Sequence, residues 1–167
     1  MVEPEETTLK EIAEVIVKEL DHRIKKKKFE FVFDYDETIP KMMLDIKLIT
    51  MVFQNLMSNA VKYTPEGGKV SLIIKKEGDK AKITIADSGY GIPKHQHNRI
   101  FSKLFRADNV TQRDTEGTGL GLYLVKEIVE TAGGKIWFES EEDKGTSFFV
   151  ELPFSGMHKR KGTKQLT

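Results

Sequence analysis

The segment FQNLMSNAVKYTP, residues 53–65, combines an apolar helical pattern with three polar side chains whose presence needs a reason. Asn55, Asn59 and Lys62 stand four and then three residues apart, so on a helix they fall within about 60° of one another. Apolar residues fill the adjacent wider arc, which puts the polar stripe at the border of the core. A solvated helix face stays open as an alternative, but Asn is a poor helix former in such a position. An amide oxygen also suits Mg²⁺, a hard cation that takes few protein ligands and prefers phosphates.

This segment lies in a helix predicted over residues 46–63. Asp45 can cap its N-terminus, and Pro65 ends it because the residue before a proline disfavours helical dihedral angles. Apolar residues at three- and four-residue spacing predict an earlier amphipathic helix over residues 7–23, behind a threonine N-cap. A later helix is predicted from the run LGLYLVKEIVETA, residues 120–132, which is followed by two glycines.

Alternating apolar residues predict the strands. They cover residues 29–35, 69–76, 80–87, 134–140 and 146–153. Gly78-Asp79 between the second and third is typical of a tight hairpin. Because strand pairs lie close in sequence and helices are not interleaved between single strands, the pattern favours a two-layer α/β (α+β) sandwich over a doubly wound sheet. The lysines at 25–28 are interpreted as a solvated connection.

Composition limits the classes of function. The 167 residues, 38% hydrophobic and 32% charged, fit one soluble domain with its own core. The 27 basic and 26 acidic residues leave a net charge of +1, which gives no argument for binding nucleic acid. Cysteine is absent, and no apolar run approaches the roughly 20 residues of a membrane helix. We therefore expect a cytoplasmic protein, or the cytoplasmic portion of a membrane-bound sensor.

The second candidate site is the stretch ADSGYGI, residues 86–92. Asp87 shares the alternation phase of Ile83 and Ile85, so its carboxylate faces the core if their side chains do. Burying a carboxylate is costly unless it gains hydrogen-bond donors, and the amino group of an adenine would be a neutral donor. The alternative is that Asp87 only begins a glycine-rich turn.

Two further stretches place polar residues next to glycines. EGTGLGL, residues 116–122, runs directly into a predicted helix, where free backbone amides favour phosphate. A polar segment precedes it instead of a strand, and the Lys of a phosphate-binding loop is missing, so neither familiar nucleotide-binding motif fits. Thr146 shares the phase of Phe148 and Val150, which puts its hydroxyl at the inward start of a strand. A purely structural threonine is the alternative there.

Together these segments resemble the catalytic and ATP-binding domain of sensor histidine kinases, within the GHKL class of ATPases that includes gyrase-type enzymes. FQNLMSNAVKYTP is similar to the family's N box, DSGYGIP to its first glycine box and IFSKLFRADN to its F box. EGTGLGLYLVKEIVE is similar to the second glycine box and GTSFFVELP to the last. These motifs follow the family's order from about residue 45 to residue 152. The resemblance implies a Bergerat-type fold, a mixed, mainly antiparallel sheet of about five strands packed on three helices.

The resemblance implies ATP and Mg²⁺ as cofactors and points to the residues that would bind them. Asn59 would coordinate Mg²⁺, while Asn55, Lys62 and Arg106 would assist catalysis near the phosphates. Asp87 would accept a hydrogen bond from the adenine amino group. The residues implied to bind the nucleotide are Asn55, Asn59, Lys62, Tyr63, Asp87, Gly89, Gly91, Ile92, Arg106, Arg113, Gly117, Thr118, Gly119, Leu120, Gly121 and Thr146.

The resemblance also implies how the domain is organised. The catalytic domain would cover residues 1–154, with residues 94–118 as a flexible ATP lid. Residues 155–167 are basic and have little to bury, so their composition predicts a disordered tail. In the gyrase-like branch, a Glu four residues before the Mg²⁺-binding Asn is the general base for water. Here that residue is Asn55, which cannot accept a proton at neutral pH. We therefore expect phosphoryl transfer to another acceptor rather than fast hydrolysis.

The family's phosphoacceptor histidine has no counterpart in this sequence, because His22 lacks the Glu and Arg that follow that histidine. The expected partners are a separate histidine-containing dimerisation domain and, downstream, a response regulator receiver domain. The domain by itself is expected to be monomeric. Two alternatives stay open: an ATP-binding regulatory module without transfer activity, and a related serine kinase of the anti-sigma type.

Overall fold

The computed structural model describes residues 1–103 and 121–159. The helices of these residues are α1 (Leu9–Lys26), α2 (Ile46–Tyr63), the short 3₁₀ helix η1 (Lys94–Arg99) and α4 (Gly121–Thr131). The strands are β1 (Glu5–Thr7), β2 (Glu30–Tyr35), β3 (Met42–Leu44), β4 (Lys69–Glu77), β5 (Lys80–Asp87), β6 (Lys135–Glu141) and β7 (Gly145–Pro153).

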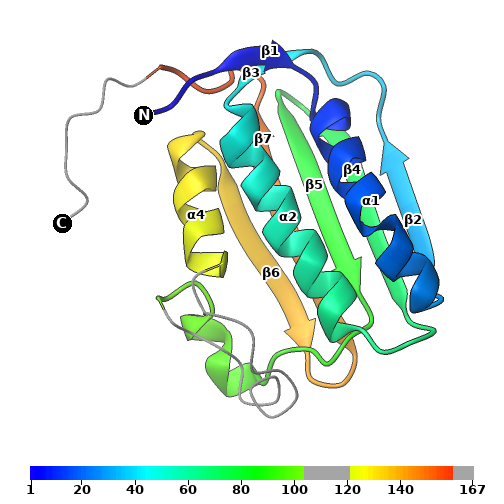
Figure 1. Ribbon diagram of the computed structural model, residues 1–167. Helices are drawn as coiled ribbons and strands as arrows, with labels where there is room; N and C mark the ends of the chain where they lie inside the picture. The colour runs from blue at the N-terminus through cyan, green and yellow to red at the C-terminus, as the bar shows by residue number, and fades with distance from the viewer. Residues whose placement is uncertain (104–120, 160–167) are drawn as a thin grey trace.

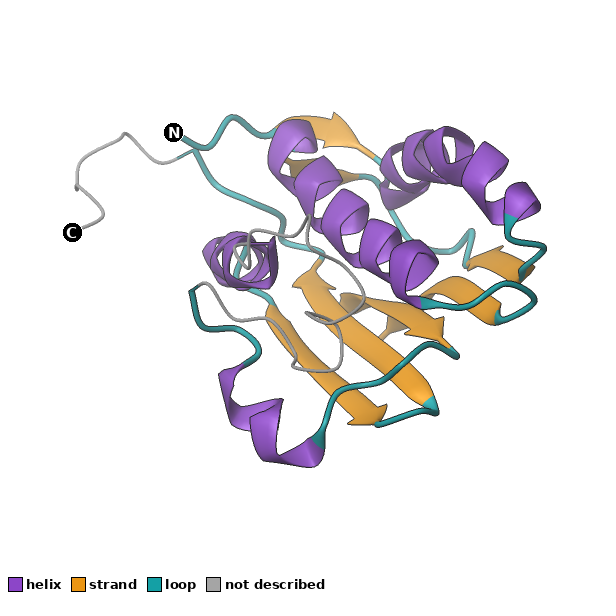
Figure 2. Ribbon diagram, turned by 60° about the horizontal axis from the view of Figure 1, so that its bottom comes forward, coloured by secondary structure: helices purple, strands orange, loops and turns teal. Residues whose placement is uncertain are grey.

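These elements form two layers. Helices α1, α2 and α4 lie over one face of a five-stranded sheet (Figure 1), and a turned view separates the helices from the sheet (Figure 2). The strand order is β2-β4-β5-β7-β6, with β2 parallel to β4 and the other neighbours antiparallel. The predicted sandwich with a mixed, mainly antiparallel sheet is therefore confirmed.

Helix α2 begins and ends where the sequence predicted. Asp45 is its N-cap, and its carboxylate accepts from the amide of Leu48 at 3.1 Å. Thr64, the residue before Pro65, is extended with φ −103° and ψ 126°, as the proline requires. Both ends are set by residues adjacent in sequence, which is why the pattern was sufficient.

Helix α1 corrects the interpretation of the lysine run. The helix continues to Lys26 instead of ending near Arg23, because Ile24 is still buried in the core. Lys27 follows as the C-cap, and its ammonium group reaches main-chain oxygens at the end of α2. Lys25, Lys26 and Lys28 are exposed, as a solvated run would be, but Lys25 and Lys26 belong to the helix and Lys27 is half-buried and structural.

The large sheet confirms the predicted hairpin, and a second, small sheet was not predicted. β4 and β5 pair up to Glu77 and Lys80, so Gly78-Asp79 forms the tight turn. β1 and β3 pair with each other, antiparallel, at the end of the sandwich where the chain begins (Figure 1). Each has three residues, which is too short to show alternation in the sequence.

Residue 157, in the segment predicted to be a disordered tail, packs against the fold. Met157 is 3% exposed, its amide donates to the main-chain oxygen of Met43 at 2.7 Å, and its sulfur accepts from the amide of Asp45 at 3.4 Å. An apolar side chain in a basic segment can still fill a gap at the end of a core, and this one does. The residues beyond 159 lie outside the described part of the chain.

The core fills the space between the two layers. Phe53, Leu56 and Met57 of α2 meet Ile83 and Ile85 of β5, and each is at most 1% exposed. Burying side chains of this kind stabilises the fold by about 1.5–3 kcal/mol each. This packing fixes how far α2 extends over the ends of the central strands.

No helix in residues 1–103 or 121–159 combines the length and the apolar character needed to cross a membrane.

Candidate functional site

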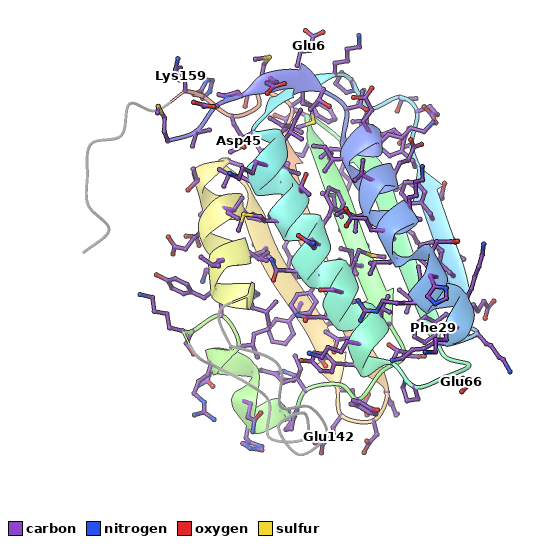
Figure 3. All side chains as sticks on the ribbon, in the orientation of Figure 1. Glu6, Phe29, Asp45, Glu66, Glu142 and Lys159 are labelled. Atoms are coloured by element: carbon purple, nitrogen blue, oxygen red, sulfur yellow. The ribbon has the colours of Figure 1, made fainter. Side chains whose placement is uncertain are left out.

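The predicted site residues that the structure describes gather at one end of the sandwich. Helix α2 and strand β5 end there, and β7 and α4 begin there (Figure 1). Asp45 marks the opposite end of α2, whereas Glu142, in the turn between β6 and β7, lies at this end (Figure 3). Asp87 and Thr146 face each other as register partners of β5 and β7. Strand pairing therefore brings together residues that are far apart in the sequence.

Asp87 is a largely buried carboxylate that uses one oxygen for the protein. Its Oδ1 accepts from the amide of Gly89 at 2.8 Å and from the amide of Thr146 at 3.2 Å. Burial raises the pKa of Asp87 to about 6, and the two amide hydrogen bonds oppose this only in part. Oδ2 has no hydrogen-bond partner among the described residues.

The glycines after Asp87 let the chain pass close to two other segments. A Cβ on Gly89 would lie 2.5 Å from the main-chain oxygen of Tyr63. Gly91 has φ +68°, and a Cβ there would overlap the main-chain oxygen of Glu141. Both positions exclude a side chain, so the loop lies against the end of α2 on one side and the end of β6 on the other.

The polar stripe of α2 is half-buried at Asn55, Asn59 and Lys62. Asn55 Nδ2 donates to the main-chain oxygen of Met51 at 2.7 Å. Its Oδ1 faces α4, because a Cβ on Gly121 would lie 2.7 Å from that oxygen. The fold therefore puts the stripe next to the last glycine of the GTGLG turn.

The C-terminal end of α2 is fixed from two sides. The main-chain oxygen of Tyr63 accepts from the amide of Tyr90 at 3.2 Å, and the Tyr63 ring centroid lies 5.6 Å from Lys62 Nζ. Lys27 Nζ donates to three main-chain oxygens at this end, at 2.8, 3.1 and 3.1 Å. Desolvation lowers the pKa of Lys27, but a cation at a helix C-terminus is favourable. No sequence pattern indicated this role of Lys27, because a lysine in a basic run is normally solvated.

Ser140 is a second residue that sequence reasoning missed. Its Oγ accepts from the amide of Ile92 at 2.8 Å and donates to the main-chain oxygen of Gly145 at 3.1 Å. It also lies 2.8 Å from Thr146 Oγ1, its register partner across the β6–β7 pair. A signal was available, since Ser140 shares the strand phase of Phe138, but the pairing register was also needed to connect it with Thr146.

Helix η1 covers the first part of the predicted lid, where no helix was predicted. His97 Nε2 lies 2.8 Å from the main-chain oxygen of Ile92. Phe101 packs edge-on against Phe138 and Phe148, with ring centroids 6.0 and 6.4 Å apart. These contacts hold the segment against the sheet. A polar run this short has no apolar periodicity from which a helix could be predicted.

Several predicted site residues lie outside the described part of the chain. They are Arg106, Arg113, Gly117, Thr118, Gly119 and Leu120. Their roles come from the resemblance.

The described residues contain no group of three His, Cys, Asp or Glu side chains arranged to hold a metal ion. A Mg²⁺ ion bound through nucleotide phosphates needs no such group, because it takes most of its ligands from phosphate and water. One or two protein oxygens suffice. The half-buried amide of Asn59 fits that chemistry.

Known proteins are similar to this chain in sequence and in fold. The family of histidine kinase-, DNA gyrase B-, and HSP90-like ATPases matches residues 44–156. The adaptive-response sensory kinase SasA of Synechococcus sp. (strain JA-2-3B'a(2-13)) is 37% identical over 156 residues, which are 93% of this chain and 41% of SasA. The sensor histidine kinase WalK of Bacillus subtilis (strain 168) is 39% identical over 132 residues, 78% of this chain and 22% of WalK. The chain thus spans less than half the length of these relatives.

Solved structures agree with the sequence comparison. The catalytic domain of the histidine kinase ThkA, free of nucleotide, matches with a TM-score of 0.79 and 32% identity, covering 92% of this chain and 97% of that one. ThkA in complex with the response regulator protein TrrA matches with a TM-score of 0.74 and 28% identity, covering 90% of this chain and 42% of that one. The chain therefore belongs to the histidine kinase-, DNA gyrase B-, and HSP90-like ATPase family, as a catalytic domain of the sensor histidine kinase type.

Proposed function

We propose that this domain binds Mg-ATP at the end of the sandwich and transfers the γ-phosphoryl group to a histidine on a separate dimerisation domain. The observation that carries the proposal is the Asp87 carboxylate, which is largely buried and whose Oδ2 accepts no hydrogen bond from the described residues. A carboxylate buried without a countercharge costs stability, and a ligand donor would offset that cost. Membership of an ATPase family implies that the ligand is ATP.

The nucleotide would extend from the sheet to the polar stripe of α2. Asp87 Oδ2 would accept from the adenine amino group. The base would lie among Tyr63, Gly89, Gly91, Ile92 and Thr146. Asn59 would hold Mg²⁺, which neutralises phosphate charge when bound. Lys62, Arg106, Arg113 and the backbone from Gly117 to Gly121 would contact the phosphates, where cations stabilise the charge that develops during transfer.

Asn55 favours transfer to a protein acceptor over hydrolysis. Its amide nitrogen is committed to the main-chain oxygen of Met51, and its oxygen faces the start of α4. A neutral amide cannot take a proton from water, so this position lacks a general base. Water bound near the phosphates would therefore be a poor nucleophile.

The acceptor and the downstream partner would be separate domains. The chain is less than half the length of SasA and WalK, and ThkA has been solved with a response regulator protein. By analogy, we propose a histidine-bearing dimerisation domain as the substrate and a response regulator receiver domain as the recipient of the phosphoryl group.

The direct test mixes the purified domain with the histidine-bearing dimerisation domain of its parent protein and γ-labelled ATP. We expect label on the acceptor that is lost in acid and stable in alkali, as phosphohistidine is. The Asn59→Asp variant is the control: it should stay folded by circular dichroism but lose nucleotide affinity and transfer.

Two other outcomes would replace the proposal with an alternative. A folded domain that binds ATP but labels no acceptor would be a regulatory module. Acid-stable label would indicate a serine kinase.

A further inference from the structure

Ser140 lies outside the five motifs, yet its hydroxyl contacts three groups near Asp87 and Thr146, where the adenine base is proposed to bind. This part of the site is called the base end. The Ile92 amide can only donate, and it lies 2.8 Å from Ser140 Oγ. The Gly145 main-chain oxygen can only accept, and it lies 3.1 Å away. Thr146 Oγ1, at 2.8 Å, can do either. The direction of this last hydrogen bond is decided by the first two.

The proton of Ser140 has one arrangement that satisfies all three contacts. A hydroxyl has one proton and two lone pairs. The proton must go to Gly145, because otherwise two oxygens would face each other without a hydrogen between them. Ser140 then accepts twice, from the Ile92 amide and from the Thr146 hydroxyl. The hydroxyl of Thr146, which is 8% exposed, therefore donates its single hydrogen bond to Ser140.

The neighbouring carboxylate of Asp87 also acts as a hydrogen-bond acceptor. Asp87 Oδ1 is taken by two main-chain amides, and Oδ2 can only accept when the group is ionised. The base end of the site therefore offers acceptors from both side chains, Asp87 and Thr146, which pair directly across β5 and β7.

The geometry points to Ser140 as a positioning residue that sets the preference of this site for a 6-amino purine over a 6-oxo purine, by holding the Thr146 hydroxyl as an acceptor. The inference rests on the proposed function, because it needs the base to lie at Asp87 and Thr146. Adenine brings an amino donor to these acceptors. Hypoxanthine and guanine bring a carbonyl oxygen to the same place, and this oxygen has no proton to give to either acceptor.

Removal of the Ser140 hydroxyl frees the proton of Thr146. The Thr146 hydroxyl can then rotate and donate to the oxygen of a 6-oxo purine. One hydrogen bond is worth about 0.5–1.5 kcal/mol net, so the ratio of the two dissociation constants should narrow by roughly two- to twelvefold. The affinity of the Ser140→Ala variant for ADP should fall by less than this factor, because Asp87 still accepts from the amino group of adenine.

The test measures dissociation constants for Mg-ADP and Mg-IDP by titration calorimetry, with wild type, Ser140→Ala and Ser140→Thr. The pH is 8, well above the pKa of about 6 for Asp87, so that this carboxyl is ionised and cannot donate. The readout is the ratio of the two dissociation constants. A general destabilisation of the fold would weaken the binding of both nucleotides alike and would leave this ratio unchanged. We expect S140A to narrow the ratio and S140T, which keeps a hydroxyl, to retain it.

The outcomes separate the inference from the proposed function. If wild type binds ADP well and S140A keeps the wild-type ratio, or S140T narrows it as much as S140A, the inference is wrong and the proposed function stands. If wild type binds neither nucleotide, both are wrong. Should S140A fail to fold, Thr146→Val and Thr146→Ser test the same acceptor: T146V should narrow the ratio and T146S should keep it, and an unchanged ratio in T146V overturns the inference.

Discussion

Asp45 and Asp87 lie at opposite ends of the sandwich. Asp45 is buried and Asp87 is largely buried. Asp45 uses both oxygens for the protein: Oδ1 accepts from the Leu48 amide at 3.1 Å and Oδ2 from the Glu3 amide at 2.9 Å. Asp87 takes two amides as well, but both on Oδ1. The same residue type with the same number of amide partners therefore serves a helix cap at one end and leaves an open acceptor at the other.

Burial and the number of hydrogen bonds therefore do not by themselves identify a binding carboxylate. What distinguishes Asp87 is the distribution of its partners between the two oxygens. Three experiments test whether Asp87 and Asp45 differ in this way.

The largest effect should come from Asp87→Asn. The amide keeps an oxygen for the two main-chain donors but puts an NH₂ donor where Oδ2 was, opposite the amino group of adenine. Loss of a hydrogen bond to a charged group, plus a donor facing a donor, should weaken Mg-ADP binding by about 100-fold or more. Titration calorimetry measures this, with circular dichroism as the check on folding. Affinity within about threefold of wild type would show that the base does not lie at Asp87.

The next effect concerns pH. The pKa of Asp87 is about 6 in the folded protein against 3.8 for the model carboxyl, so it is raised. A raised pKa means that the stability contribution of this group is complete below 3.8 and is lost as the pH rises through 6. Above that range the ionised carboxylate costs the ligand-free fold on the order of 2–3 kcal/mol.

D87N cannot ionise, so its free energy of unfolding relative to wild type should increase between about pH 4 and 6 and then stay level. Urea unfolding without nucleotide at several pH values measures this. A difference that does not change with pH would mean that Asp87 has an ordinary pKa.

The smallest effect should come from Asp45→Ala. It leaves the amides of Leu48 and Glu3 without their acceptor and should lower the free energy of unfolding by about 1–2 kcal/mol. Asp45→Ser, which can still cap α2, should lose less. The affinity of either folded variant for Mg-ADP should match wild type, and a clear loss of affinity would remove the contrast with Asp87.

Much of the fold could be predicted because its signals are local. Asp45 and Pro65 mark the two ends of α2 and lie within a few residues of them, and Gly78-Asp79 joins two strands directly. β1 and β3 could not be predicted, because three-residue strands carry no readable alternation and depend on each other for pairing.

The site was predictable to a smaller degree. Strand alternation indicated that Asp87 and Thr146 point inward, but it could not show that they are register partners. Ser140 and Lys27 escaped notice because each acts on a segment far away in the sequence.

Local sequence patterns were enough to predict the ends of α2, the β4–β5 hairpin and the inward phase of Asp87, and five ordered motifs were enough to indicate the family. Three features follow only from the folded chain: both amide donors of Asp87 bind Oδ1, Ser140 faces Thr146, and Asn55 faces Gly121. The physical reason is that a period of two residues fixes which face a side chain takes, whereas the partner it meets depends on register and on how closely distant segments pack.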